Sequence, residues 1–202
     1  MGPSEPSGDS DWDLAERAKQ GDESAYARLV ERYQAPIHGF IFRSVGDVET
    51  ARDLAQEVFV RAWFALARVR AKAKFSTWLF QIAVNLCRDH VKSKATRNAR
   101  NTESFARRAD DERAEDREFA SPELSPAEDA ETREAIDALE AEIRALPDEL
   151  RSSFVLGAVE HQPYKEVASA LGLSAKAVEV RIYRARRLLG ERLRRLGFRV
   201  SE

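Results

Sequence analysis

Hydrophobic residues recur at helical spacing over two stretches of this 202-residue chain, 12–94 and 129–199, and no stretch alternates as a strand would. A repeat at i, i+3, i+4 and i+7 predicts amphipathic helices. Residues 95–128 lack this repeat and contain SPELSP, which is typical of a linker. The pattern predicts an all-α protein with two small helical domains, 12–97 and 129–199, joined by a flexible linker at 98–128.

Residues 164–195 predict a short helix, a tight turn and a longer helix. Gly172 suits the C′ position of the first helix and Ser174 the N-cap of the second. The apolar face of the first helix comprises Tyr164, Val167, Ala168 and Leu171, and that of the second Val178, Ile182, Ala185, Leu189 and Leu193. The side chains left pointing outward are Lys176, Glu179, Val180, Tyr183, Arg184 and Arg187. Such a pair is typical of a helix-turn-helix, whose second helix enters the DNA major groove.

The charge of this segment is local. Residues 174–199 hold nine Lys/Arg and two Asp/Glu, whereas the whole chain has a formal net charge of −2. Basic groups that neutralise phosphates release counterions and add salt-dependent affinity for DNA. A solvated helix face is the alternative interpretation, but the turn residues, the apolar register and the outward Tyr183 favour DNA binding by this segment.

A second helix is predicted at 47–67. Its core stripe comprises Ala51, Leu54, Ala55, Val58, Phe59, Ala62, Trp63 and Leu66. Another face carries Asp53, Gln56, Glu57, Val60 and Phe64. An acidic and polar stripe that ends in exposed hydrophobic residues can dock another protein. A solvated face with a Glu57–Arg61 pair, worth about 0.3–0.5 kcal/mol, explains the same residues equally well.

A third helix is predicted at 76–94, with Ser76 as its N-cap and Phe75 packing on Phe80 as a hydrophobic staple. Its core stripe comprises Trp78, Leu79, Ile82, Ala83, Leu86 and His90, and its polar stripe Gln81, Asn85, Arg88 and Lys92. Residues 71–100 hold seven basic residues and one acidic residue. Amides among cations suit nucleic acid, because Gln and Asn can read base edges while Lys and Arg hold phosphates.

Aromatic side chains at such a groove can stack on unpaired bases, at about 1–3 kcal/mol each. Core packing is the alternative for Phe75 and the favoured interpretation for Trp78. Cys87 and His90 are interpreted as structural.

Composition narrows the function classes. With 43% hydrophobic and 34% charged residues, the chain resembles an ordinary soluble protein, and it has no apolar run long enough to insert in a membrane. Residues 1–11 are acidic and lack a hydrophobic core region, so a disordered tail is expected rather than a signal peptide. A single cysteine and three dispersed histidines predict no disulfide, metal or other cofactor, and a reducing cytoplasm. No enzyme is expected, and no small-molecule substrate.

Three segments carry a family resemblance: DLAQEVFVRAW (53–63), FSTWLFQIAVNLCRDHV (75–91), and the stretch 145–189, which begins ALPDELRSSFVLGAVEHQPYKEVASALGLSAKAVEV. In this order they closely resemble bacterial sigma factors of the extracytoplasmic-function (ECF) group. The resemblance implies a protein that directs core RNA polymerase to promoter DNA, recognising the −35 element and melting the −10 element, without enzymatic activity of its own.

The resemblance also implies where each partner binds. The helix at 47–67 would bind the β′ clamp coiled coil of the polymerase, and the second domain would meet the β flap. The expected core-polymerase contacts are Asp53, Gln56, Glu57, Val60 and Arg61. The segment 69–92 would hold a flipped −10 base, with Asn85 at the base-reading position. The expected −10 contacts are Lys72, Lys74, Phe75, Thr77, Gln81, Asn85, Arg88 and Lys92. An anti-sigma factor is an expected further partner.

The expected −35 contacts are Ser174, Lys176, Glu179, Val180, Tyr183, Arg184 and Arg187. Here the chain departs from the commonest family pattern, which has Lys or Arg followed by Ser where this chain has Glu179 and Val180. Glutamate can accept a hydrogen bond from cytosine N4, and valine can contact a thymine methyl. We therefore expect an unusual −35 element. The two lysines of VRAKAKF (69–75) are a second departure and leave the −10 preference open.

Two rival interpretations come from other classes. A stand-alone helix-turn-helix regulator would explain 130–199 but not the face of 47–67 or the basic 71–100 segment. A helical adaptor with basic patches for RNA or lipid would show no sequence preference. Residues 103–134 hold twelve Asp/Glu and five Lys/Arg, so the linker could mimic DNA against the basic helix, although a solvated spacer is the favoured interpretation.

Overall fold

The computed structural model describes residues 9–70, 73–101 and 126–198, and every regular element in these ranges is helical. The elements are α1 (Asp11–Lys19), α2 (Glu23–Val45), α3 (Val48–Leu66), α4 (Phe75–Asn101), α5 (Pro126–Arg144), α6 (Asp148–Phe154), the π-helical η1 (Val155–Val159), α7 (Tyr164–Leu171) and α8 (Ala175–Arg195). The all-α prediction is confirmed.

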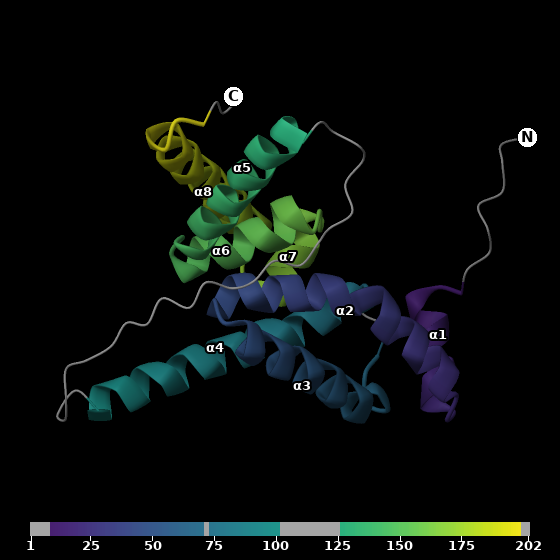
Figure 1. Cartoon of the computed structure of the whole chain (residues 1–202). Coiled ribbons are helices and arrows are strands. Elements are labelled where there is room, and N and C mark those ends of the chain that lie inside the picture. The colour runs from purple at the N-terminus through teal and green to yellow at the C-terminus, as the bar shows by residue number, and fades with distance from the viewer. Residues whose placement is uncertain (1–8, 71–72, 102–125, 199–202) are drawn as a thin grey trace, which may run out of the picture.

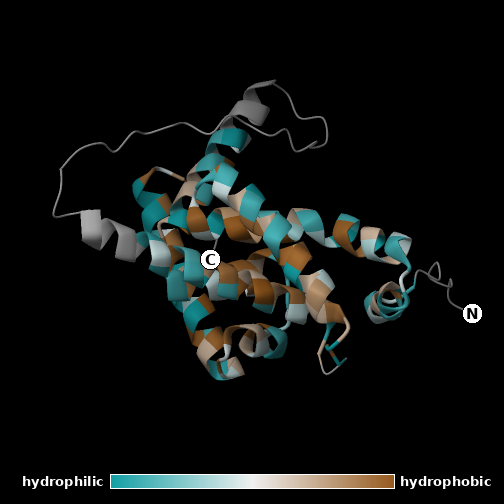
Figure 2. Cartoon of the chain, turned by 90° about the horizontal axis from the view of Figure 1, so that it is seen from below, coloured by the Kyte–Doolittle hydropathy of each residue, from teal (hydrophilic) through white to brown (hydrophobic). Residues whose placement is uncertain are grey.

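Helices α1 to α4 form the first group, in which α2, α3 and α4 pack on one another and α1 packs on α2 (Figure 1). Local residues set these boundaries. The Asp22 carboxylate caps α2 by accepting from the backbone N–H of Ala25 at 3.1 Å, and Asp47 caps α3 in the same way. Gly46 ends α2 in the left-handed region, at φ 79°. Bands of hydrophobic and hydrophilic residues lie on different faces of the helices (Figure 2), as amphipathic helices require.

The start of α4 differs from the prediction. The helix begins at Phe75, so Ser76 lies within it rather than at the N-cap, and its hydroxyl donates to the Gln162 side-chain oxygen at 3.5 Å. The predicted staple is absent because Phe75 packs on other aromatic rings, at 5.4–5.7 Å from Trp12, Tyr33 and Trp78, while Phe80 packs on Phe40. Tertiary aromatic packing has replaced a local capping motif.

The ends of the predicted linker are helical. Helix α4 continues to Asn101, and α5 begins at Pro126, so both helices extend into the range 98–128. Residues 102–125 lie outside the described residues, and so does any interpretation of the acidic segment as a DNA mimic or a spacer.

Helices α5 to α8 form the second group, which contains the helix-turn-helix. Gly172 ends α7 at φ 69°, and the Ser174 hydroxyl caps α8 by accepting from the Ala177 N–H at 3.1 Å. All five residues of the predicted α8 stripe are buried. Tyr164 was expected in the core of α7, but its side chain is exposed.

The π-helical turn η1 was not predicted. Its backbone bonds run from residue i to i+5, as between the Glu160 N–H and the Val155 carbonyl at 2.9 Å. A Cβ at Gly157 would meet the Ile182 side chain at 2.5 Å, so the absent side chain lets α8 approach η1 closely. No hydrophobic repeat marks such a turn in a sequence.

The two groups are packed together. α7 lies along α4, and α5 and α6 contact α2, so the second group stacks on the first (Figure 1). Buried residues of both groups belong to one continuous hydrophobic core. We call the contact region between α1–α4 and α5–α8 the seam. The sequence predicted two domains on a tether, and this contact between them was not predicted.

Candidate functional site

The outward face of α8 is built as the sequence predicted. Its fold-side stripe is buried, which leaves Ser174, Lys176, Glu179, Val180, Tyr183, Arg184 and Arg187 exposed. Tyr183 is 66% exposed although it is aromatic. Lys176 and Glu179 pair at 2.8 Å across one turn, and both side chains face solvent. An exposed pair of this kind contributes little to stability, so both groups can turn to a ligand.

Other arginines of α8 hold the helix in place. Arg181 bonds Glu149 of α6 at 3.0 Å, and Arg192 bonds Glu142 of α5 at 3.1 Å. These inward pairs fix the rotation of α8 about its axis. The outward cations can therefore present a rigid, basic surface that fits a DNA groove.

The second predicted face, on α3, is also exposed. The side chains of Asp53, Gln56, Val60 and Phe64 reach solvent, and Glu57 is half-buried. Phe64 is 75% exposed and Val60 49% exposed, which is unusual for hydrophobic residues of a helix. The Glu57–Arg61 pair forms at 2.7 Å, as the solvated-face interpretation expected. Trp63 was predicted in the core but lies at its edge, 37% exposed and 4.8 Å from the Tyr26 ring.

The polar stripe of α4 forms the third surface. Gln81, Asn85, Arg88 and Lys92 are all exposed. Lys74, at the start of the helix, is exposed as well, whereas Lys72 lies outside the described residues. Two amide groups thus lie between cationic groups along one helix, as the sequence predicted for a nucleic-acid surface.

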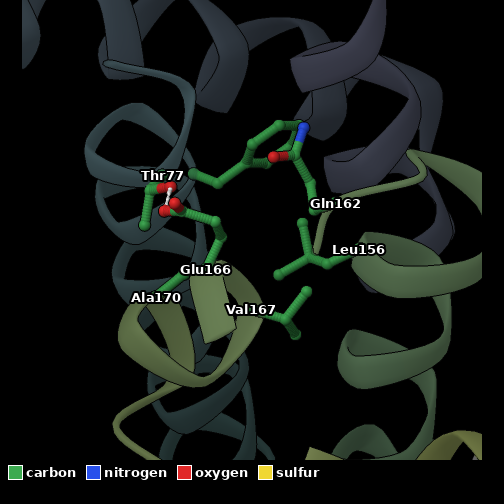
Figure 3. A pocket seen from close by; sticks show the side chains of 7 residues that line it. Thr77, Leu156, Gln162, Glu166, Val167 and Ala170 are labelled. Carbon is green, nitrogen blue, oxygen red and sulfur yellow. Dashed lines mark hydrogen bonds between the residues drawn. The ribbon is translucent and has the colours of Figure 1, made fainter. Parts of the chain in front are cut away.

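Two of the expected −10 contacts are not accessible. Phe75 is 2% exposed, and its ring lies inside the aromatic cluster with Trp12, Tyr33 and Trp78. Thr77 is 4% exposed, and its hydroxyl donates to the Glu166 carboxylate of α7 across the seam (Figure 3). The expectation that these two side chains face DNA is not met in this arrangement, because distant residues cover them.

The seam carries further polar contacts. Arg43 at the end of α2 donates three hydrogen bonds to the Glu140 carboxylate of α5, at 2.6, 3.0 and 3.2 Å, and lies 4.0 Å from Glu160. Burial raises the pKa of the Glu160 carboxyl, although Arg43 and then His161 oppose the shift. These charged groups are mostly shielded from water, so their Coulomb attraction is stronger than that of exposed pairs and the loss of one partner would leave an uncompensated charge.

Two backbone carbonyls also accept bonds across the seam. Arg151 of α6 donates to the Ser44 carbonyl at 3.2 Å, and Arg88 of α4 donates to the Leu171 carbonyl at 3.4 Å. Arg88, an expected DNA contact, therefore has a partner on α7 in this arrangement. A clue to the seam did exist in the sequence. Phe80, Val84 and Cys87 give α4 a second apolar face, and all three are buried.

Neither a metal site nor a membrane-spanning helix occurs in the part of the chain that the structure describes. No group of three or more His, Cys, Asp or Glu side chains in this part of the chain could hold a metal ion. None of the helices in the described ranges has the length and apolar character needed to cross a membrane.

Two family models match the chain. The model of sigma-70 region 2 matches residues 29–97, and the model of sigma-70 region 4 matches residues 136–189. The first match includes the α3 face and the α4 stripe, and the second includes the helix-turn-helix. Helix α1 lies outside both.

Relatives of similar length match almost the whole chain. The RNA polymerase sigma-H factor of Pseudomonas aeruginosa is 34% identical over 194 residues, which span 93% of this chain and 96% of the relative. The ECF RNA polymerase sigma-E factor of Escherichia coli strain K12 is 31% identical over 195 residues, with the same shares. The ECF sigma factor SigW of Bacillus subtilis is 29% identical, over 89% of this chain and 95% of its own.

Solved structures share the fold. The structure of CnrH in complex with the cytosolic domain of CnrY superposes with a TM-score of 0.66 at 29% identity, covering 93% of this chain and 99% of CnrH. The sigma factor RpoE of Bartonella quintana, solved with the anti-sigma factor NepR, gives a TM-score of 0.65 at 17% identity, over 84% of this chain and 96% of its own.

Proposed function

The chain belongs to the ECF group of RNA polymerase sigma factors, and we propose that its three exposed surfaces divide the work of promoter recognition among core polymerase, the −10 element and the −35 element. Sigma factors are transcription initiation factors, so no catalytic activity of its own is assigned to it. The observation that supports the proposal is the presence, on one chain, of the α8 face, the α4 stripe and the α3 face.

The α3 face binds core polymerase. Phe64 and Val60 supply exposed apolar area, and Asp53 and Glu57 supply carboxylates that can meet cationic groups. The family resemblance assigns this helix to the β′ clamp coiled coil and the second helical group to the β flap. Apolar contacts would provide affinity, while the carboxylates would select the orientation.

The α4 stripe reads the −10 element. Asn85 is exposed in the middle of the stripe, where its amide can both donate to and accept from a base edge. Gln81 and Arg88 flank it and can hold the neighbouring base or phosphate. Bases captured outside the duplex stabilise the melted state, so binding energy drives strand separation.

The outward face of α8 reads the −35 element as duplex. Glu179 and Val180 lie near the N-terminal end of the recognition helix, the end that approaches base edges in helix-turn-helix complexes. Arg184 and Arg187 lie farther along and hold phosphates.

The closed arrangement, in which the two helical groups pack together at the seam, must open before both promoter elements can be read. Elements 25 base pairs apart lie roughly 80 Å apart along B-DNA. A compact chain of this length has a radius of gyration of about 17 Å. The seam also covers Thr77 with Glu166. We therefore propose that the arrangement with a closed seam is a resting form and that polymerase binding separates the two helical groups.

A protein partner that holds the resting form is also expected. CnrH, a relative with the same fold, was solved with the cytosolic domain of CnrY. By the family resemblance, the corresponding partner of this chain is an anti-sigma factor. The chain would meet its polymerase and promoters in the cytoplasm.

Run-off transcription from a randomised promoter library tests the proposal. Bacterial core polymerase is supplied with and without the chain, and transcripts are sequenced. Transcripts that appear only with the chain and share one −35/−10 pair are the expected result. Silence, together with failure to co-elute with core polymerase, would favour a stand-alone operator-binding regulator. Binding to nucleic acid without any sequence preference would favour the adaptor.

A further inference from the structure

Helix α1 has no role in the surfaces described above. It comprises Asp11–Lys19 and precedes the sigma-70 region 2 match, which begins at residue 29. Its side chains nevertheless reach the connection between α3 and α4. This connection leads directly into the helix proposed to read the −10 element.

Two α1 side chains bond carbonyls of that connection. The Trp12 indole N–H donates to the Ala73 carbonyl at 2.8 Å, and the Lys19 ammonium donates to the Val69 carbonyl at 3.3 Å. The residues are 61 and 50 positions apart in sequence, so these are tertiary contacts. A connection between helices has few backbone partners of its own, so side-chain donors on a neighbouring helix restrict its conformations.

The Trp12 ring also touches the start of α4. Its centroid lies 5.5 Å from that of Phe75, with the planes at 84°, and 6.4 Å from that of Trp78. Edge-to-face packing of this kind adds to the burial of the rings. One side chain thus links the connection, through its N–H, to the first turn of α4, through its ring.

Helix α1 is itself firmly held. Ser10 and Asp13 form a capping box at its N-terminus, and its apolar face is buried against the fold. Arg17 binds Asp22 through two nitrogens, at 2.7 and 3.0 Å, and the Ser24 hydroxyl first, then these bonds, lower the pKa of the Asp22 carboxyl to about 2. Asp11 accepts from both Arg32 and Tyr33 of α2. A donor placed on such an element has a defined position.

We infer that Trp12 and Lys19 are positioning residues for the −10 reading surface. They hold the connection at Val69 and Ala73 in a fixed place relative to the first turn of α4. Preorganisation reduces the conformational cost of binding and keeps contacts to one base from spreading to others. The inference rests on the proposed −10 function of α4.

The test removes the hydrogen-bond donor of Trp12 and keeps an aromatic ring at that position. Trp12→Phe removes the indole N–H but retains an aromatic side chain, and Lys19→Met removes the ammonium in a second variant. Trp78→Phe is the matched control. It belongs to the same aromatic cluster, and its indole donates no hydrogen bond among the described residues. Each full-length variant is assembled with core polymerase.

Two readouts are measured for each holoenzyme: affinity for single-stranded oligonucleotides with the −10 sequence found for the wild type, and base preference in a library randomised over that element. Trp12→Phe is expected to lose roughly two- to tenfold in affinity, the range of one net hydrogen bond, and to broaden the base preference. Lys19→Met should show the smaller change in the same direction. Trp78→Phe should keep both values, and all variants should keep −35 preference and co-elution with core polymerase.

The possible outcomes distinguish a failure of this inference from a failure of the proposed −10 function. If the wild-type holoenzyme shows no −10 preference, the proposed function fails and the inference fails with it. If the wild type shows a preference and Trp12→Phe keeps it, the inference alone is overturned. Equal losses in Trp12→Phe and Trp78→Phe, in step with equal drops in thermal stability, would also overturn it, because loss of packing would then explain both.

Discussion

Single residues on α8 show how exposure and pairing decide which side chains are available to DNA. Glu179 is an acidic residue on a basic face, and its one partner among the described residues is Lys176 of the preceding turn. Since both side chains are solvent-exposed, breaking the pair costs little. Glu179 can then accept a hydrogen bond from a cytosine amino group in the major groove.

Replacing Glu179 by Lys should change preference at one position of the −35 element, from cytosine toward guanine, because lysine donates where glutamate accepts. We expect a discrimination change of about 1–3 kcal/mol at that position, read from binding to a −35 library. Arg187→Ala is the control. It should weaken binding to all sequences and lower the salt slope by about 1, without altering preference. An unchanged profile for Glu179→Lys would remove this residue from base reading.

At the scale of single residues, the faces of a helix could be predicted from the sequence, whereas contacts between residues distant in sequence could not. The five residues predicted for the apolar stripe of α8 are buried and the residues predicted to point outward are exposed, because a helix face follows from residue spacing alone. Phe75 and Thr77 were placed at the DNA surface, but Trp12 covers the first and Glu166 the second. These covering residues lie 63 and 89 positions away in sequence, beyond any local pattern.

At the scale of elements, α3 packs on the fold through one face and exposes another face that can bind a partner. Its core stripe fixes the helix to α2 and α4, which leaves Phe64 and Val60 exposed. An exposed aromatic residue gains nothing from folding, so its replacement should not lower stability. Its value would lie in binding.

Phe64→Ser should weaken co-elution with core polymerase by roughly tenfold or more, because a docked aromatic ring commonly contributes over 1 kcal/mol. The melting temperature should stay unchanged. Val48→Ser, at the exposed first position of the same helix, provides the comparison and should retain full binding. Equal retention of polymerase by the two variants would return the α3 face to a solvated surface.

The turn between α7 and α8 depends on backbone conformation rather than space. Gly172 has φ 69°, and a Cβ added there would meet no other atom within 4 Å. Gly172→Ala should therefore cost about 1 kcal/mol of unfolding free energy, from the strained backbone alone. Gly190 sits inside α8, where a Cβ would make an ordinary contact at 3.5 Å with the Arg194 side chain. Gly190→Ala should stabilise by up to about 1 kcal/mol.

Urea unfolding of Gly172→Ala and Gly190→Ala checks these two predictions, because the expected changes in unfolding free energy have opposite signs. Two losses of similar size would mean that added volume, and not φ, governs both positions.

The helix-turn-helix itself was predictable because Gly172 and Ser174 mark its turn. The π-helical η1 was not, because no local pattern marks it and the close approach of Ile182 to Gly157 is a tertiary contact.

At the scale of the whole molecule, the seam changes how the chain must be understood. Helix periodicity gave both helical groups but could not show that they share one core. The contact depends on pairs such as Arg43–Glu140, whose partners are 97 positions apart on opposite sides of the linker. Such pairs look like ordinary surface charges in a sequence. The second apolar face of α4 was the only local sign.

Cys87, the one cysteine of the chain, reports on the seam. It is 6% exposed, and burial raises the pKa of its thiol to about 11, although the neighbouring Ser44 and Arg151 oppose the shift. The reactive thiolate is therefore scarce in the closed form at pH 8, and labelling requires the neighbourhood to open. Because Arg151 belongs to α6, separation of the two helical groups removes part of what covers Cys87.

Arg43→Ala should accelerate labelling of Cys87 by a disulfide reagent by roughly tenfold, because it removes all three hydrogen bonds from Arg43 to Glu140 and leaves the shielded Glu160 carboxylate without this cation. Arg28→Ala, on the same helix, removes an ion pair with Asp9 far from the seam and should leave the rate unchanged. Small-angle scattering on the same samples should show a larger radius of gyration for Arg43→Ala alone. Equal rates and equal radii in the two variants would mean that Arg43 does not hold the closed form. A faster rate of Cys87 labelling without an increase in radius of gyration would instead indicate local fraying of α4.

If the expected result holds, the Arg43→Ala variant should also bind −10 single strands without core polymerase more tightly than the wild type does. The reason is that Thr77 and its neighbours would no longer be covered by α7.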